Sequence, residues 1–186
     1  MSDDRARLFV ALELPAEIRG ALYGWAREHA AGVGRLRLVE PESLHVTLCF
    51  LGSRPATEVD EIAARCRDAT SGHPPATLTV GDALWLPPRR PRVLTVALAD
   101  QGDDRLAAVQ AALSGALAGG GFYEPETRPF LAHVTVARVQ RDARIRSPEL
   151  PAPDAMRFTA ATVTLFRSRL GRGPARYEAL ASVTLS

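Results

Sequence analysis

The pattern His-x-Thr-x occurs twice in this chain, each time inside an apolar run typical of a β-strand. The first copy holds His45 and Thr47, and the second holds His133 and Thr135. Because side chains alternate along a strand, residues two apart point to one face and the residue between them points to the other. Each run therefore predicts a strand that buries its Val and Leu side chains and presents an imidazole beside a hydroxyl.

Length and composition predict a soluble globular protein. The 186 residues are 46% hydrophobic and 24% charged, which is enough for one large domain or two small lobes. No apolar run approaches the ~20 residues that cross a bilayer, and the run at residues 8–12 is too short for the core of a signal peptide. We expect one domain over residues 1–186, monomeric, cytoplasmic and without a membrane partner.

The order of the predicted elements favours the α+β class. We expect strands at residues 7–12, 36–39, 44–51, 76–86, 92–98, 130–139, 158–170 and 175–185. Apolar residues at helical spacing predict helices around residues 18–25, 59–66 and 106–117, and residues 140–154 read as a polar, proline-rich loop. The two motifs lie 133 − 45 = 88 residues apart, and each half of the chain carries a helix and a motif strand. We predict a bilobal fold with two pseudo-symmetric, mainly antiparallel sheets, helices on the outside and a central cleft.

Two imidazoles and two hydroxyls in one cleft are suited to chemistry at a phosphate. In-line displacement at phosphorus needs a base for the entering water and an acid for the departing oxygen. Histidine suits both roles because its unperturbed pKa of ~6.5 lies close to working pH. The hydroxyls of Thr47 and Thr135 can donate hydrogen bonds to the nonbridging oxygens as charge builds in the transition state.

Other chemistries lack their usual residue patterns. The histidines have no carboxylate at metal-binding spacing, and the chain has no G-x-S-x-G elbow, phosphate-binding P-loop or dinucleotide fingerprint. Cys49 and Cys66 are isolated, which argues against a disulfide framework and a zinc site, so we interpret them as small buried hydrophobes. We therefore expect no metal and no cofactor.

Some residues outside the motifs are candidates for RNA contact. Trp85 lies close in sequence to Arg89 and Arg90 and could stack a base, although an edge position in a lobe is the simpler interpretation. The arginines between residues 141 and 146 could line an approach for RNA, although a solvated loop is simpler. His29 and His73 are most simply solvated.

Four blocks of the chain together resemble the two-histidine phosphoesterase superfamily, in particular the LigT-like RNA 2′,3′-cyclic phosphodiesterases once called 2′-5′ RNA ligases. The blocks are RLFVALELP at residues 7–15, LHVTLCFLG at 44–52, RPFLAHVTVAR at 128–138, and FRSRL at 166–170 followed by Gly173 and YEAL at 177–180. They span nearly the whole chain in order.

The resemblance implies a bilobal fold and hydrolysis of an RNA terminal 2′,3′-cyclic phosphate to a 2′-phosphate. It implies that His45 donates a proton to the departing 3′ oxygen and that His133 accepts a proton from water. Thr47 and Thr135 would hold the phosphate, and Arg138 after the second motif would contact the phosphate or brace the strand.

The resemblance also marks Arg128, at the start of the second motif block, as a possible RNA contact. Cys49 stands where relatives often have Lys, which removes a positive charge. Ala132 stands where relatives usually have Pro, which changes the stiffness of the backbone.

Two alternatives remain open from the sequence. The enzyme could act on a small cyclic phosphate such as ADP-ribose cyclic phosphate, or the protein could bind RNA ends without catalysis. The expected partners are accordingly RNA 3′ ends or cyclic-phosphate nucleotides. Reversible 2′-5′ RNA ligation is also permitted, because a catalyst accelerates both directions of a reaction.

Overall fold

A computed structural model of the chain describes residues 4–101, 104–169 and 175–186. The strands are β1 (Arg5–Glu13), β2 (Leu36–Leu38), β3 (His45–Pro55), β4 (Ala76–Leu86), β5 (Val93–Asp100), β6 (His133–Val139), β7 (Arg157–Ala160), β8 (Thr162–Arg169) and β9 (Arg176–Thr184). The helices are α1 (Ala16–His29), α2 (Val59–Thr70) and α3 (Arg105–Gly119), with short 3-10 turns at Pro41–Ser43 and Ala56–Glu58.

The strands form one curved sheet that has two halves. Its order is β7-β4-β5-β6-β3-β1-β8-β9, with β2 paired to β6, and the paired strands run antiparallel. The halves meet where β3 lies beside β6, through the backbone pair Val46 and Val134. The α+β class is thus confirmed, and the two expected sheets lie edge to edge rather than apart.

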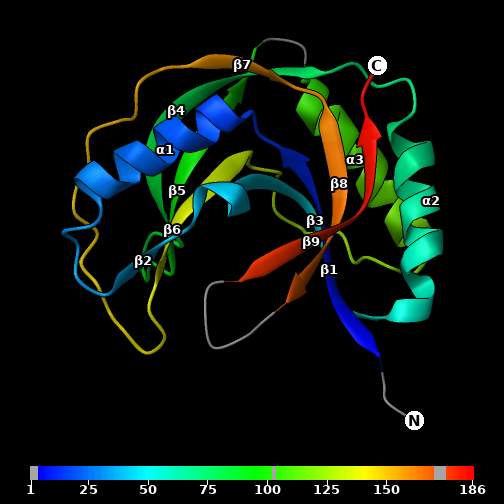
Figure 1. The fold of residues 1–186 in the computed structure, drawn as a ribbon, viewed down its shortest axis with the longest axis horizontal. Coiled ribbons are helices and arrows are strands. Elements are labelled where there is room, and N and C mark those ends of the chain that lie inside the picture. The colour runs from blue at the N-terminus through cyan, green and yellow to red at the C-terminus, as the bar shows by residue number, and fades with distance from the viewer. Residues whose placement is uncertain (1–3, 102–103, 170–174) are drawn as a thin grey trace.

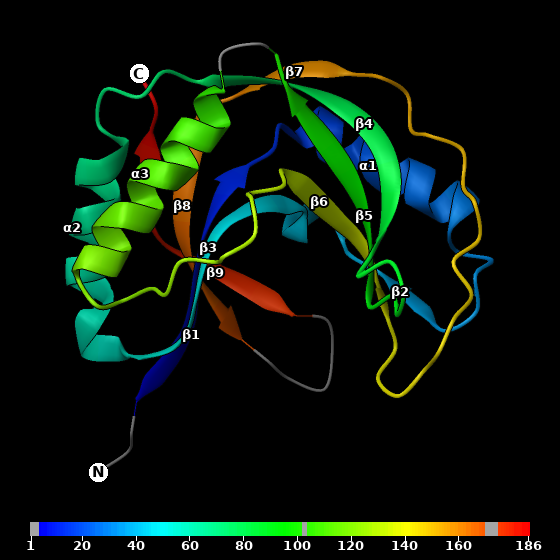
Figure 2. The ribbon, with the colours of Figure 1, turned by 180° about the vertical axis from the view of Figure 1, so that it is seen from behind.

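The helices cover the outside of the two halves (Figures 1 and 2). Helix α1 lies over the half that contains β4, β5 and β6, whereas α2 and α3 lie side by side at the other half. The expected stripe of α1 is confirmed, since Ile18, Leu22 and Trp25 are buried. The helices therefore pack on the outer face of the sheet and leave the inner face, which carries the motif histidines and threonines, uncovered by helices. Within the described ranges, no helix is long and apolar enough to span a membrane.

Both motif strands carry a bulge at the same place. In β3, Leu48 is the extra residue opposite the Val10–Ala11 step of β1. In β6, Val136 is the extra residue opposite the Leu94–Thr95 step of β5. Each bulge lies three residues after its histidine, and two consecutive residues are buried there in both strands. Because a bulge shifts the alternation by one position, the fifth residue after each histidine returns to the histidine face.

One predicted strand is wrong in its extent. The run at residues 158–170 is divided at Ala161 into β7 and β8, which pair with β4 and with β1, in opposite halves of the sheet. No Gly or Pro marks this break, so a local pattern reads it as continuous. The end of this run at Leu170 and the predicted turn at residues 171–174 lie outside the described residues.

Candidate active site

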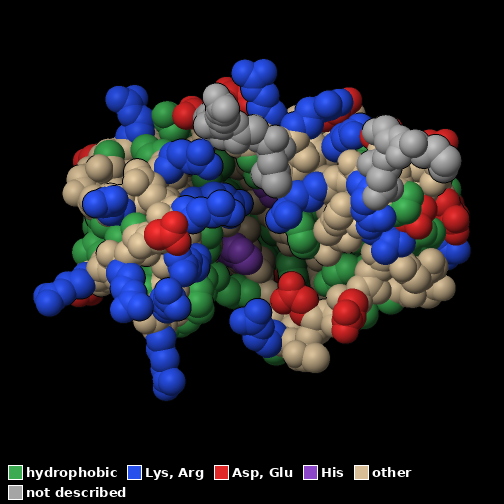
Figure 3. Space-filling view, turned by 90° about the horizontal axis from the view of Figure 1, so that it is seen from below, with side chains coloured by type: hydrophobic (Ala, Val, Ile, Leu, Met, Phe, Trp, Pro, Cys, Tyr) green, Lys and Arg blue, Asp and Glu red, His purple; other side chains and the backbone are tan. Residues whose placement is uncertain are grey.

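The contact between β3 and β6 brings the two motifs together. Around the antiparallel pair of Val46 with Val134, the register sets His45 across from Thr135 and Thr47 across from His133. Neighbouring strands lie about 4.8 Å apart and alternate residues about 7 Å apart, so the two histidine Cα atoms are on the order of 8 Å apart. Both side chains are partly exposed. Figure 3 shows histidine side chains at the bottom of a hollow that arginines surround.

Backbone carbonyls hold both imidazoles in the same tautomer. His45 Nδ1 lies 2.8 Å from the carbonyl oxygen of Ser43, and His133 Nδ1 lies 2.8 Å from that of Leu131. A carbonyl oxygen only accepts hydrogen bonds, so each Nδ1 carries a proton and donates it. Each acceptor lies two residues before its histidine, a second feature that the motifs share. The Nε2 atoms are left for proton transfer, and that of His45 lies 3.1 Å from Thr47 Oγ1.

An aromatic cluster surrounds His45, and the sequence analysis did not identify its role. The ring centroid of His45 lies 4.9 Å from that of Phe9, 5.2 Å from that of Tyr177 and 6.4 Å from that of Phe166. Phe9 and Phe166 are partners across β1 and β8, and Tyr177 lies on β9. Two of the blocks that resemble the family contain these aromatic residues, so a hint of their importance was present in the sequence. Their contact with His45 could not be predicted, because it depends on how the strands pair.

The environment of His45 favours its neutral form. Burial lowers the pKa of His45 from 6.5 to about 4. Burial is the largest cause of this net value; the positive charges of Arg138 and His133 also lower the pKa of His45, whereas the Ser43 carbonyl raises it. In the protein without substrate, His45 is therefore neutral at pH 7, with Nε2 able to accept a proton.

This lowered pKa predicts a stability change with pH. Between pH 6.5 and about 4 the unfolded chain binds a proton at His45 and the folded chain does not, so stability rises with pH across this window. We expect His45→Gln to remove roughly 2–3 kcal/mol of this dependence. Urea unfolding at half-unit pH steps measures it, with His73→Gln as the control variant. Parallel curves for wild type and His45→Gln would contradict the shift.

Arg138 lies on the same face as the second motif because of the bulge in β6. It is exposed, and Arg37 is its direct partner across β2 and β6. The pairing places two guanidinium groups side by side on this face of the sheet. Both arginines line a small hollow together with Glu40, Ser43 and Tyr177, and the Tyr177 ring contacts that of His45. Arg138 thus shares the face of the second motif, its binding of phosphate stays a prediction, and Arg37 is a neighbour that the sequence analysis did not identify.

The other predicted RNA contacts occupy different surroundings. The Trp85 indole N–H donates to the Pro148 carbonyl at 3.0 Å, and that of Trp25 donates to Pro151 at 3.2 Å. Both indoles therefore hold the long loop after β6, and Trp85 is half-buried as the simpler interpretation expected. Arg128 is exposed in the segment between α3 and β6.

Three arginines do meet away from the motif strands. Arg89 and Arg90, after β4, and Arg144, in the loop after β6, line a cavity of about 270 Å³. The predicted approach for RNA along this loop therefore has a cationic hollow, and its use by RNA stays a prediction.

The two cysteines are buried, as the sequence predicted. Cys49 is 1% exposed and Cys66 is 4% exposed, and burial raises the pKa of each thiol to about 12. The bulge at Leu48 turns Cys49 away from the histidine face. In the described part of the chain, no group of three or more His, Cys, Asp or Glu side chains has the arrangement of a metal site.

Comparison with known proteins identifies the family. A profile of the LigT-like phosphoesterases matches residues 12–95. The RNA 2′,3′-cyclic phosphodiesterase of Escherichia coli K12 is 33% identical over 94% of this chain and 93% of its own length. The enzyme of that name from Archaeoglobus fulgidus is 31% identical over 77% of this chain and 76% of its own length.

Solved structures agree with this assignment. The crystal structure of E. coli LigT complexed with 3′-AMP superposes with a TM-score of 0.83 at 30% identity, covering 98% of this chain and 99% of that one. The crystal structure of TT0787 from Thermus thermophilus superposes with a TM-score of 0.80 at 25% identity, covering 96% of this chain and 97% of that one. With this fold, the paired motifs and these identities, the chain belongs to the LigT-like phosphoesterase family.

Proposed function

We propose that this protein is an RNA 2′,3′-cyclic phosphodiesterase that hydrolyses the terminal cyclic phosphate to a 2′-phosphate without a metal. The observation that carries the proposal is the β3–β6 register, which sets the two His–Thr couples beside each other. In both histidines, Nδ1 is protonated and donates to a backbone carbonyl, so Nε2 is the nitrogen that can accept or donate the transferred proton. The names of the E. coli and A. fulgidus relatives support the substrate class.

The reaction uses one imidazole on each side of the phosphorus. His133 Nε2 takes a proton from water, whose oxygen then bonds to phosphorus. The bond between phosphorus and the 3′ oxygen breaks, and that oxygen takes a proton from His45 Nε2. Thr47 and Thr135 donate hydrogen bonds to the nonbridging oxygens, and Arg138 offsets their charge.

His45 must gain its proton when substrate binds. Its pKa of about 4 in the free protein leaves Nε2 unprotonated at pH 7, whereas a proton donor needs the charged ring. A cyclic phosphate carries a negative charge, and an anion at hydrogen-bonding distance favours imidazolium. Substrate binding and protonation of His45 are therefore coupled, and the free protein does not hold a buried positive charge.

The decisive assay is a short RNA ending in a 2′,3′-cyclic phosphate, incubated with EDTA. The proposal requires a 2′-phosphate product at a rate that EDTA does not change. A 3′-phosphate product would contradict the assigned leaving group, and turnover that needs added metal would contradict the acid–base mechanism. Binding of the RNA end without turnover would favour the noncatalytic alternative, and hydrolysis of ADP-ribose cyclic phosphate alone would favour the small-nucleotide alternative.

The proposal also covers the partners, the location and the oligomeric state of the enzyme. Its partners are RNA 3′ ends, and residues 1–186 act as one domain in a cytoplasmic monomer. Trp85 and Arg128 are secondary RNA contacts, to be tested after the cleft residues.

A further inference from the structure

Phe50 is a large apolar side chain that the fold leaves exposed beside the candidate active site. In the described chain, the exposed large hydrophobic residues are Phe50 and Leu131, each 45% exposed. Phe50 is the fifth residue after His45, just as Arg138 is the fifth residue after His133. The shared bulge turns both side chains onto the face of the histidines. One motif strand thus presents an arginine next to its catalytic couple, and the other presents an aromatic ring.

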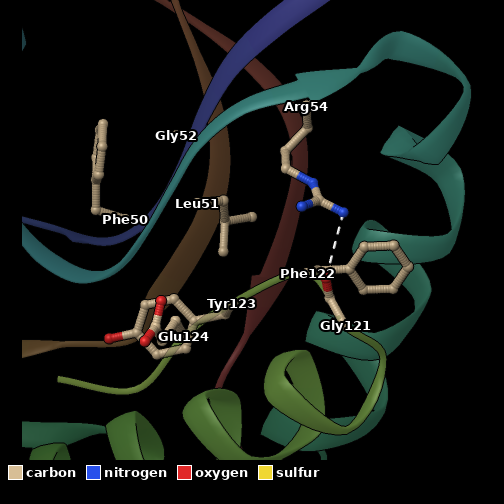
Figure 4. Close-up of a pocket in the computed structure, with 8 residues that line it drawn as sticks. All are labelled: Phe50, Leu51, Gly52, Arg54, Gly121, Phe122, Tyr123 and Glu124. Atoms are coloured by element: carbon tan, nitrogen blue, oxygen red, sulfur yellow. Dashed lines mark hydrogen bonds between the residues drawn. The ribbon is translucent and has the colours of Figure 1, made fainter.

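A cavity of about 360 Å³ has Phe50 among its lining residues. It lies between β3 and the segment that follows α3 (Figure 4), and its lining residues are Phe50, Leu51, Gly52, Arg54, Gly121, Phe122, Tyr123 and Glu124. The Arg7 guanidinium lies 4.7 Å from the centroid of the Phe50 ring. Arginine on an aromatic ring fixes the ring and brings a positive charge to the edge of the cavity.

The charges in the cavity favour a base over a phosphate. Arg54 forms an ion pair with the Glu58 carboxylate at 2.7 Å and donates a hydrogen bond to the Gly121 carbonyl at 3.3 Å. Glu124 is exposed, and its carboxylate repels a phosphate but accepts hydrogen bonds from a base amino group. An exposed aromatic ring is a stacking surface for a nucleobase, and the Phe50 ring points away from Tyr123 and Glu124 (Figure 4).

The distance along β3 between Thr47 and Phe50 indicates which nucleotide of the RNA would place its base on the Phe50 ring. At about 3.3 Å per residue, Phe50 lies on the order of 10 Å along β3 from Thr47. A terminal nucleotide whose cyclic phosphate lies between the motif couples directs its 5′ side away from them. The neighbouring nucleotide is therefore the better occupant.

We propose that Phe50 stacks the nucleobase of the nucleotide that precedes the cyclic-phosphate terminus, so that this enzyme selects oligonucleotides over cyclic mononucleotides. The inference rests on the proposed function and names a subsite for it. Arg7 stabilises the ring and offers its charge to the linking phosphate.

The test compares two substrates on three variants. We measure kcat/KM for a 2′,3′-cyclic mononucleotide and for a trinucleotide with the same terminal base. Phe50→Ala is expected to lower the ratio of trinucleotide to mononucleotide kcat/KM by about 5- to 100-fold. Phe50→Trp keeps a stacking surface and should hold the ratio within about 3-fold of wild type. Tyr23→Ala removes an aromatic side chain from α1, on the outer side of the sheet, and is the control.

Each outcome is decisive. An unchanged ratio in Phe50→Ala would overturn the subsite, as would an equal loss in Tyr23→Ala, which would indicate an effect that is not specific to the Phe50 ring. A 2-aminopurine at the preceding position of a 2′-phosphate product RNA gives a second readout. Its fluorescence should be quenched by wild type and Phe50→Trp but not by Phe50→Ala. Absence of turnover on both substrates by wild type would instead contradict the proposed function.

Discussion

His45→Ala and His133→Ala are each expected to lower kcat on the cyclic-phosphate RNA by about 10²–10⁴-fold, because each removes one proton-transfer group. The double variant should lose little more than the worse single variant, since the two groups act in one transition state. Single-turnover rates over pH 5–9 measure the effect. Wild type should give a bell-shaped profile whose limbs belong to the histidine pair rather than to either residue.

The control for this result is His73→Ala, a histidine that lies outside the motif strands. It should retain wild-type kcat. Thermal unfolding should show that the cleft variants remain folded, because both imidazoles are partly exposed and contact the main chain through one hydrogen bond each. A loss below tenfold in either variant would exclude that histidine from proton transfer.

Thr47→Val and Thr135→Val are expected to lower kcat by about 10²–10³-fold each, the usual cost of removing one preorganised donor to a developing charge. Valine has nearly the shape of threonine, so the change removes the hydroxyl and keeps the packing of the strand. KM should change much less than kcat, because the charge on the phosphate oxygens develops mainly in the transition state. Steady-state kinetics on the trinucleotide separate the two parameters.

Serine provides the matched control at both positions. Thr47→Ser and Thr135→Ser keep the hydroxyl and should remain within about tenfold of wild type. Thr47 also lies 3.1 Å from His45 Nε2, so Thr47→Val should shift the acidic limb of the pH profile as well. Equal activity of the Ser and Val variants would show that the hydroxyls do not contact the reacting phosphate.

Local patterns in the sequence were sufficient for most of the helices and strands and for the shared face of each His–Thr couple. The spacing of Ile18, Leu22 and Trp25 predicts the buried face of α1, and the alternation of His45 with Thr47 predicts their shared face. These signals work because helix and strand periodicities are properties of the local backbone. Cys49 was also assigned correctly to the interior, although its parity alone pointed to the histidine face.

Features that depend on strand pairing were beyond the sequence. The bulges at Leu48 and Val136 are defined by the partner strands, so the orientation of Phe50 required the register of β1 against β3. The aromatic cluster at His45 joins β1, β8 and β9 across more than 150 residues of chain, and no window of the sequence contains it. The break at Ala161 has the same cause. The residues of β7 and β8 have similar strand propensity, but β7 pairs with β4 and β8 pairs with β1.

In the described chain, the two halves of the sheet meet at the Val46–Val134 pair, and this has a mechanical consequence. A small rotation about such a pivot displaces atoms in proportion to their distance from it. The two His–Thr couples adjoin the pivot and would keep their spacing, whereas the rims of the hollow would move apart. An incoming strand could thus be admitted by widening the entrance while the distance for proton transfer stays constant.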